Sequence, residues 1–130
     1  MRLWSQQLIP YLPDKQLGGQ WVEIRMILGS IAKHGKVNHS TVNYVNNHPI
    51  DYLYAYGLHV AKECRKRGRY CNPDFVKSYY SAMAEQIFSI QDKEKCIVYP
   101  EHDLNYLEEC LLNLEGKGIY LRDKINIDNS

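Results

Sequence analysis

A regularly spaced set of apolar side chains within residues 15–34 constrains the fold of this chain more than any other feature. The side chains recur every three or four residues, so at roughly 100° per residue they form one narrow stripe along a helix. The stripe consists of Leu17, Trp21, Ile24, Leu28 and Ile31. Asp14 is expected to cap this helix and Gly35 to end it. The sequence therefore predicts a long helix with one face against a core.

Proline and glycine residues divide the rest of the chain into further helical stretches. Proline suits the first position of a helix, and glycine commonly follows the last. Helices are therefore predicted over about 49–67, with Gly68 as the stop, over 73–90, and over 100–116. The apolar stretch 96–99 is short enough for a strand or a buried connection. The prediction is an all-α chain of about four helices.

The length of the chain favours a single compact domain. At 130 residues it can bury a real core, but it is too short for two comfortable ones. We expect one domain over 1–130, made of a basic part (1–70), C-terminal helices (71–117) and a tail along the surface (118–130). No apolar run approaches the roughly 18 residues of a membrane span, and the N-terminus lacks a continuous apolar signal core. A cytoplasmic protein that does not enter the membrane is expected.

The cysteine spacing does not indicate a metal site. Successive cysteines are separated by 6, 24 and 13 residues, which matches neither C-x-x-C pairs nor a zinc finger. The four are Cys64, Cys71, Cys96 and Cys110. The cluster Glu101, His102 and Asp103 could bind metal, but adjacent residues on a helix point about 100° apart. Asp103 as a helix cap accounts for the cluster better. We expect free thiols, no metal site and no cofactor.

Charge is distributed unevenly along the chain. Residues 1–70 carry ten Lys and Arg against four Asp and Glu, a net charge of +6. Residues 71–130 carry six against eleven, a net charge of −5. Such a division indicates a basic face of the kind that binds phosphate or another polyanion. The alternative is that the two halves neutralise each other in the fold.

Gly18, Gly19 and Glu23 interrupt the best helical stretch. Glu23 lies about 120° from the apolar stripe, on the same flank as Gly19. A glycine inside a helix costs about 1 kcal/mol relative to alanine, so a consecutive pair requires a reason. One reading is close packing of another helix, with Glu23 solvated. The other is space for a ligand, with a partly buried carboxylate available for acid–base work.

Three motifs occur in a specific order and spacing. D-K-Q-L-G-G-Q-W-V-E-I spans 14–24, L-G-S-I-A-K-H spans 28–34, and A-K-E-C-R-K-R-G spans 61–68. Together they resemble the pyrimidine-dimer DNA glycosylases of the phage endonuclease V type, whose catalytic acid lies in a D-Q-H-L-x-x-E-Y-R-E-like helix followed by G-x-x-x-K-H. The residues that match without a gap are Asp14, Leu17, Glu23, Gly29, Lys33 and His34. The opening 1–13 and P-E-H-D at 100–103 look like a subgroup of short bacterial relatives.

The resemblance implies a compact helical fold with DNA glycosylase and abasic-site lyase activity. In that family the N-terminal α-amine attacks C1′ of a damaged nucleotide, and the resulting Schiff base permits β-elimination of the 3′ phosphate. A glutamate stabilises the developing sugar cation. Carried onto this chain, the catalytic residues are Met1 and Glu23, and the partner is double-stranded DNA. The expected DNA contacts are Arg2, Lys15, Gln16, Trp21, Arg25, Lys33, His34, Arg65, Lys66 and Arg67.

The chain departs from the family pattern at several positions. The family exposes a threonine amine after methionine removal, but the bulky Arg2 blocks that removal here, so the amine is that of Met1. Val22 and Met26 replace arginines that contact DNA, and Gln16 replaces a histidine. The aromatic, basic tail of the family is absent. Two alternatives therefore stay open: a non-catalytic nucleic-acid-binding module, and a small-molecule or nucleotide enzyme that reuses the Glu23 pocket.

Overall fold

The computed structural model describes residues 2–68 and 98–125, and every regular element in these ranges is a helix. The α-helices are α1 (Asp14–His34), α2 (Ile50–Lys66) and α5 (Leu104–Glu115), and the 3-10 helices are η1 (Gln6–Tyr11), η2 (Ser40–Asn47) and η3 (Arg122–Lys124). The predicted all-α fold is confirmed. The predicted helix over 73–90 lies outside the described residues. Of the stretch 96–99, the described residues Val98 and Tyr99 do not form a strand.

Helix α1 confirms the longest prediction, with one correction at its start. Gly35 ends the helix in the left-handed conformation, with φ 81°, and its N–H donates to the Ile31 carbonyl at 2.8 Å. The N-cap residue is Pro13, not Asp14, and no side chain caps the helix. Because Pro13 is extended, the helix begins at Asp14, whose carboxylate instead accepts a hydrogen bond from Arg67.

The buried face of α1 is wider than the predicted stripe. Leu17, Ile24 and Leu28 are fully buried, whereas Trp21 and Ile31 are partly buried against the same core. Two further positions outside the predicted stripe are also buried, Gln20 and Ile27. A buried glutamine needs hydrogen-bond partners, and these come from the N-terminal segment.

The starts of α2 and α5 differ from the predicted ones by local capping. Pro49 is the N-cap of α2 and not its first residue, and Gly68 follows the helix with φ 76°. Helix α5 begins at Leu104, four residues after Pro100, because Asp103 is the N-cap. The Asp103 carboxylate accepts a hydrogen bond from the Tyr106 N–H at 2.9 Å, so the predicted cap is confirmed.

The chain after α5 returns to the core instead of following the surface. Leu121 and Ile125 are buried, which corrects the prediction of a surface tail for these residues. The Arg122 guanidinium donates to both carboxylate oxygens of Glu108, at 2.7 and 2.8 Å, and to Glu115. These ion pairs hold η3 against α5, a long-range arrangement that local periodicity does not reveal.

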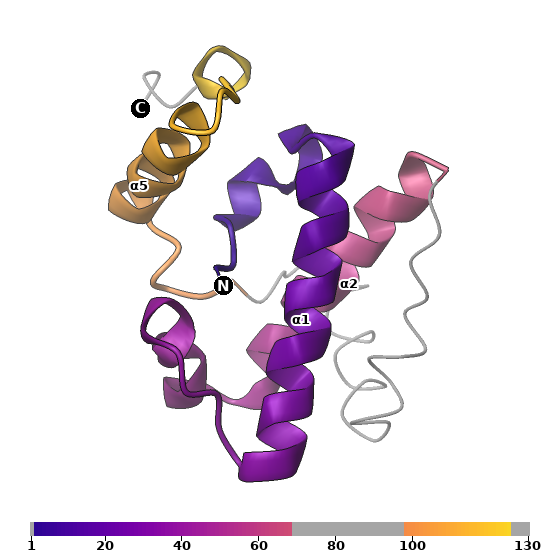
Figure 1. The fold of residues 1–130 in the computed structure, drawn as a ribbon, viewed down its shortest axis with the longest axis vertical. Coiled ribbons are helices and arrows are strands. Elements are labelled where there is room, and N and C mark those ends of the chain that lie inside the picture. The colour runs from indigo at the N-terminus through magenta and orange to yellow at the C-terminus, as the bar shows by residue number, and fades with distance from the viewer. Residues whose placement is uncertain (1, 69–97, 126–130) are drawn as a thin grey trace.

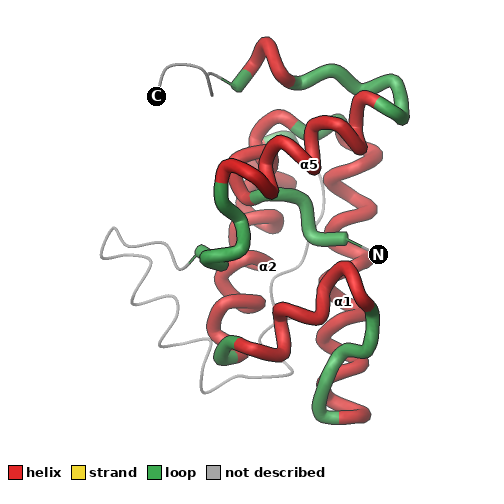
Figure 2. The backbone as a smooth tube through the Cα atoms, turned by 90° about the vertical axis from the view of Figure 1, so that its left-hand side faces the viewer, coloured by secondary structure: helices red, strands yellow, loops and turns green. Residues whose placement is uncertain are grey.

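The N-terminal segment, residues 2–5, lies inside the helical assembly. Figures 1 and 2 show the N-terminal end between α5 on one side and α1 with η2 on the other. Leu3 and Ser5 are fully buried. The N-terminal segment is therefore placed next to the helix that carries Glu23.

None of the described helices combines the length and apolar character needed to cross a membrane.

Candidate active site

A cavity of about 420 Å³ opens beside Glu23. Its walls come from the N-terminal segment, α1, the beginning of η2, and the end of α5 with the turn that follows. The lining residues are Arg2, Trp4, Lys15, Gln16, Gly19, Gln20, Glu23, Thr41, Asn113 and Lys117. Four of the residues predicted from the sequence are thus brought to one place: Arg2, Lys15, Gln16 and Glu23.

Gly19 keeps part of this cavity open. Apart from its chain neighbours and the backbone of its own helix, a Cβ atom built at Gly19 would meet no heavy atom of the described residues within 4 Å. Close packing of another helix therefore does not explain this glycine. The ligand-space reading is the one that the geometry favours, since Gly19 and Glu23 are one turn apart on the same cavity wall.

The Glu23 side chain is half-buried, and one of its carboxylate oxygens is enclosed by protein. Oε2 is buried and has no hydrogen-bond partner among the described residues. A buried polar atom without a partner costs roughly 1–3 kcal/mol, more when the group is charged. The alternative of a simply solvated glutamate is therefore wrong for Oε2. Because Glu23 lines the cavity, its carboxylate lies beside any ligand bound there.

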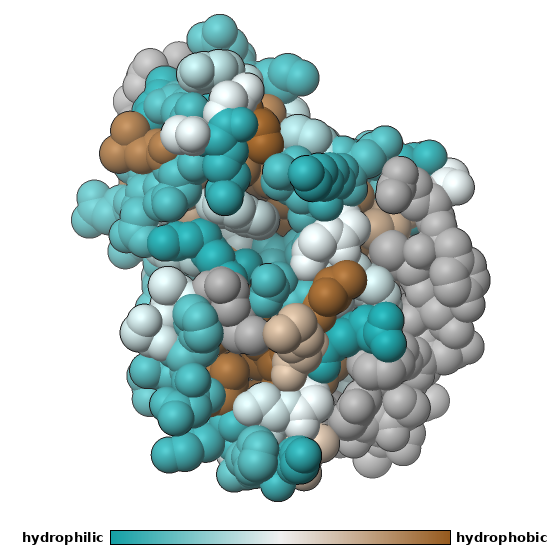
Figure 3. Space-filling view, in the orientation of Figure 1, coloured by the Kyte–Doolittle hydropathy of each residue, from teal (hydrophilic) through white to brown (hydrophobic). Residues whose placement is uncertain are grey.

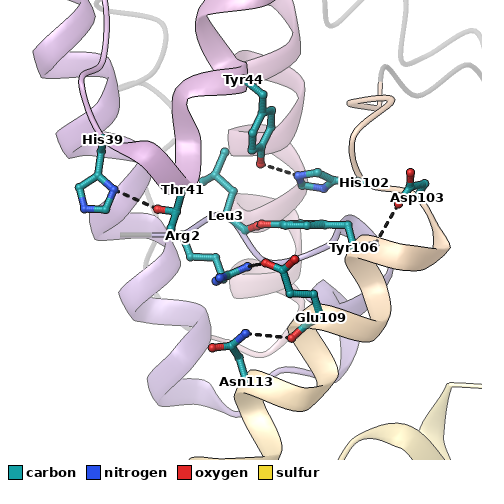
Figure 4. A network of polar contacts seen from close by, with 10 residues as sticks. All are labelled: Arg2, Leu3, His39, Thr41, Tyr44, His102, Asp103, Tyr106, Glu109 and Asn113. Atoms are coloured by element: carbon teal, nitrogen blue, oxygen red, sulfur yellow. Dashed lines mark hydrogen bonds and ion pairs between the residues drawn. The ribbon is translucent and has the colours of Figure 1, made fainter.

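Arg2 connects the N-terminal segment to α5. Its guanidinium donates to Glu109 Oε2 at 2.8 Å and lies 5.9 Å from the Trp4 ring centroid and 5.8 Å from that of Tyr106. Figure 4 shows Arg2 reaching from the N-terminal segment to Glu109 on α5. Partial burial alone would lower the pKa of Arg2, but the hydrogen bond to Glu109 contributes to an overall rise. The main chain of residue 2 is thereby fixed at the cavity wall.

Comparison with known proteins identifies the family from the same part of the chain. A family model described as pyrimidine dimer DNA glycosylase matches residues 1–78, which is 78 of the 130 residues. The chain belongs to this family. No curated protein and no solved structure matches the chain.

The pyrimidine dimer DNA glycosylase match covers only part of the cavity wall. Arg2, Lys15 and Glu23 lie inside the matched residues, whereas Asn113 and Lys117 lie outside them. The sequence analysis did not predict these two residues, because no local pattern marks them. They reach the cavity only through the packing of α5 beside the N-terminal segment.

The remaining predicted DNA contacts of this glycosylase family member are spread along α1 and α2. Arg25, Lys33 and His34 are exposed on α1, Arg65 and Lys66 are exposed near the end of α2, and Trp21 is half-buried. His34 lines a second cavity of about 370 Å³. His34 follows Lys15 by 19 positions on α1, about 28 Å at 1.5 Å per residue. The structure does not gather all predicted contacts at Glu23.

Arg67 is used within the chain. Its Nε donates to Glu63 at 2.9 Å, and its two terminal nitrogens donate to Asp14 and to main-chain carbonyls at 2.6 to 3.4 Å. Those carbonyls belong to Ile9, Pro10 and Leu12. A guanidinium has five N–H donors, and these five contacts account for them. Arg67 therefore stabilises the junction between α2 and the segment before α1 instead of facing a DNA phosphate.

The acidic and histidine residues before α5 diverge instead of converging on an ion. Glu101 binds His48 at 2.8 Å, and Asp103 caps α5. His102 Nδ1 accepts from the Gln6 N–H at 3.3 Å, and its Nε2 lies 2.7 Å from the Tyr44 hydroxyl (Figure 4). Within residues 2–68 and 98–125, no group of three or more His, Cys, Asp or Glu could hold a metal.

Apolar side chains reach the surface of α1 next to the cavity-lining face. Val22 and Met26 are 50% and 53% exposed. Figure 3 shows hydrophobic residues on the surface in the region of α1. The resemblance described in the sequence analysis implies arginines at these two positions, so this surface of α1 offers apolar contact instead of positive charge.

Proposed function

We propose that this protein is a DNA glycosylase with associated abasic-site lyase activity, and that Met1 and Glu23 carry out the reaction. The main support is the buried, unpartnered Oε2 of Glu23 on a cavity whose wall also contains Arg2. Met1 lies outside the described residues, so the position of its amine is part of the proposal. A trans peptide bond separates consecutive Cα atoms by about 3.8 Å, so an amine one residue before Arg2 is within reach of the cavity.

The proposed reaction begins with the neutral terminal amine. Its nitrogen attacks C1′ of the deoxyribose, and the bond from C1′ to the base breaks with its electron pair leaving on the base. Ring opening gives a Schiff base, and loss of a C2′ proton then expels the 3′ phosphate by β-elimination. An α-amine has an unperturbed pKa of about 8, so a substantial fraction is neutral at physiological pH.

Glu23 supplies charge stabilisation in this scheme. As the base leaves, positive charge develops on the sugar, and a carboxylate fixed nearby stabilises it without prior rearrangement. Glu23 Oε2 can stabilise this positive charge because no group within the described residues donates a hydrogen bond to it. The same carboxylate can then assist the proton transfers of Schiff-base formation.

The cavity fits a nucleotide turned out of a duplex. Its volume of about 420 Å³ falls in the range of ordinary ligand pockets, roughly 300–1,000 Å³. An enzyme that attacks C1′ of a stacked nucleotide has to expose it first. Lys15 and Lys117 on the cavity wall offer cations for the flanking phosphates.

Glu23→Gln tests this proposal, because it keeps the shape of the side chain and removes its charge. We expect base release from an irradiated duplex to fall roughly 10²–10⁴-fold, with the thermal midpoint nearly unchanged. Asp123→Asn is the control, since Asp123 is an exposed carboxylate in η3, outside the cavity lining. Unaltered base release in Glu23→Gln, or loss of folding in place of activity, would contradict the proposed role.

A further inference from the structure

The main chain of the N-terminal segment forms hydrogen bonds to side chains from three helices instead of to a neighbouring strand. Gln20 Nε2 donates to the Arg2 carbonyl at 2.9 Å, and the Trp4 N–H donates to Gln20 Oε1 at 2.7 Å. The Tyr56 hydroxyl lies 2.6 Å from the Trp4 carbonyl, and the Tyr106 hydroxyl donates to the Leu3 carbonyl. Figure 4 shows Tyr106 and Leu3 meeting in this way.

These contacts have the alternation of an extended strand. In a strand, the polar main-chain groups of residues i and i+2 point to one side and those of i+1 to the other. Gln20 and Tyr56 contact residues 2 and 4, whereas Tyr106 contacts residue 3. Helices α1 and α2 therefore provide the hydrogen-bond partners on one side of the segment, and α5 provides the partner on the other side.

The Gln20 amide fixes the register of the segment. Its oxygen must face the Trp4 N–H and its nitrogen the Arg2 carbonyl, so the reversed orientation would oppose donor to donor and acceptor to acceptor. A shift by one residue would turn the groups of residues 2 and 4 away from Gln20. Gln20 is 1% exposed and Tyr56 is fully buried, so a lost contact cannot be replaced readily by water.

Gln20 and Glu23 occupy neighbouring positions on one helix. Residues three apart share a face of an α-helix, and both side chains line the same cavity. A single turn of α1 thus holds the main chain of residue 2 and presents the candidate catalytic carboxylate. The distance from the main chain of residue 2 to Glu23 is consequently set by a short series of bonds.

We infer that Gln20, supported by Tyr56 and Tyr106, is a positioning residue that fixes the N-terminal amine relative to Glu23. This inference rests on the proposed function. An apolar residue would fill position 20 if packing were its only purpose, whereas the amide specifies the register of the segment. Displacing a reacting group by about 1 Å can cost 10²-fold in rate.

Gln20→Met tests the inference, because methionine has a similar length and no amide. The probe is untagged protein with duplex DNA containing one abasic site, and the readout is single-turnover borohydride trapping at saturating DNA. We expect the trapping rate to fall about 10²-fold while the dissociation constant for the duplex stays within about twofold. Hydrogen exchange at the Trp4 amide should accelerate in the free protein, because that N–H loses its acceptor.

Two further variants separate positioning from general stability. Asn46→Leu removes an analogous amide pair, in which Asn46 binds both the N–H and the carbonyl of Val37 at 3.0 and 2.7 Å, and it should leave trapping unchanged. Tyr56→Phe removes one hydroxyl and should lower the trapping rate less than Gln20→Met. It also provides the test if Gln20→Met does not fold.

The possible failures are distinguishable. Faster exchange at Trp4 with an unchanged trapping rate would overturn the positioning role and leave the proposed function intact. Equal losses of trapping in Gln20→Met and Asn46→Leu would also overturn it, since the effect would then follow stability. No trapping by the wild-type protein would contradict the proposed function itself, and the positioning role would fall with it.

Discussion

Buried polar side chains distinguish the candidate site at the scale of single residues. Several oxygens in the described part of the chain are buried without a partner, including those of Ser5, Gln6 and Tyr99, but Glu23 contributes the carboxylate. Carboxylates cost more to bury unpaired than hydroxyl or amide groups do. The fold tolerates this cost at the one position where the cavity, Gly19 and the N-terminal segment meet.

His102 makes stability depend on pH. Burial lowers its pKa to about 4 from the ordinary 6.5, against the opposing charges of Glu101 and Asp103. Between these values the unfolded chain binds a proton that the folded protein excludes. The contribution of His102 to the free energy of unfolding is therefore complete above pH 6.5. It decreases as the pH falls toward 4, by about 2 kcal/mol between pH 7 and pH 5.

Urea unfolding at pH 7 and at pH 5 measures this effect. His102→Asn removes the titrating group, so its free energy of unfolding should change less over the same interval than that of the wild type. The measured m-values should agree between the two proteins, which makes the comparison valid. The same pH dependence in both would show that other groups cause it.

At the scale of elements, local sequence determines where helices begin and end, but not what they contact. The apolar stripe, Gly35, Gly68 and Asp103 act within one or two turns, so the boundaries they set were largely predictable. Arg67 shows the limit. A cation in a basic run at a helix C-terminus is expected to face solvent or phosphate. Apart from Glu63, its partners lie more than fifty residues earlier in the chain, and no local pattern predicts them.

Arg67→Lys should destabilise the junction between α2 and the segment before α1. Lysine keeps the charge but cannot reproduce the planar set of five donors, so several main-chain carbonyls lose their partner. We expect a loss of about 2 kcal/mol in the free energy of unfolding. The matched control is Arg65→Lys at an exposed position of the same helix, which should change it by less than about 0.5 kcal/mol. Equal unfolding midpoints for the two variants would contradict this account.

At the scale of the whole molecule, the cavity joins parts of the chain that sequence patterns treat separately. Arg2, Lys15 and Glu23 were predicted from the family resemblance, because they lie in contiguous stretches of the sequence that resemble the family. Asn113 and Lys117 reach the same cavity from the other end of the sequence. Gln20 could not be identified as part of the site, because two of its three partners are main-chain atoms and the third, the Tyr56 hydroxyl, lies on another helix.

The Arg2–Glu109 ion pair also links the basic and acidic halves of the chain. Neutralisation between the halves therefore occurs at this point, while Lys15 and Lys117 remain on the cavity wall. The proposed activity depends on this arrangement, because it places the start of the chain beside α1. The proposed chemistry requires the N-terminal segment to be held beside Glu23, and no single sequence motif provides that placement.

Borohydride trapping with peptide mapping tests the central claim most directly. Untagged protein, mixed with duplex DNA that contains an abasic site, should form a covalent adduct on the α-amine of residue 1. Acetylation of the terminus should prevent the adduct, and Lys15, which lies on the same cavity wall, should remain unmodified. An adduct on an internal lysine, or none from a protein that binds the duplex, would contradict the account.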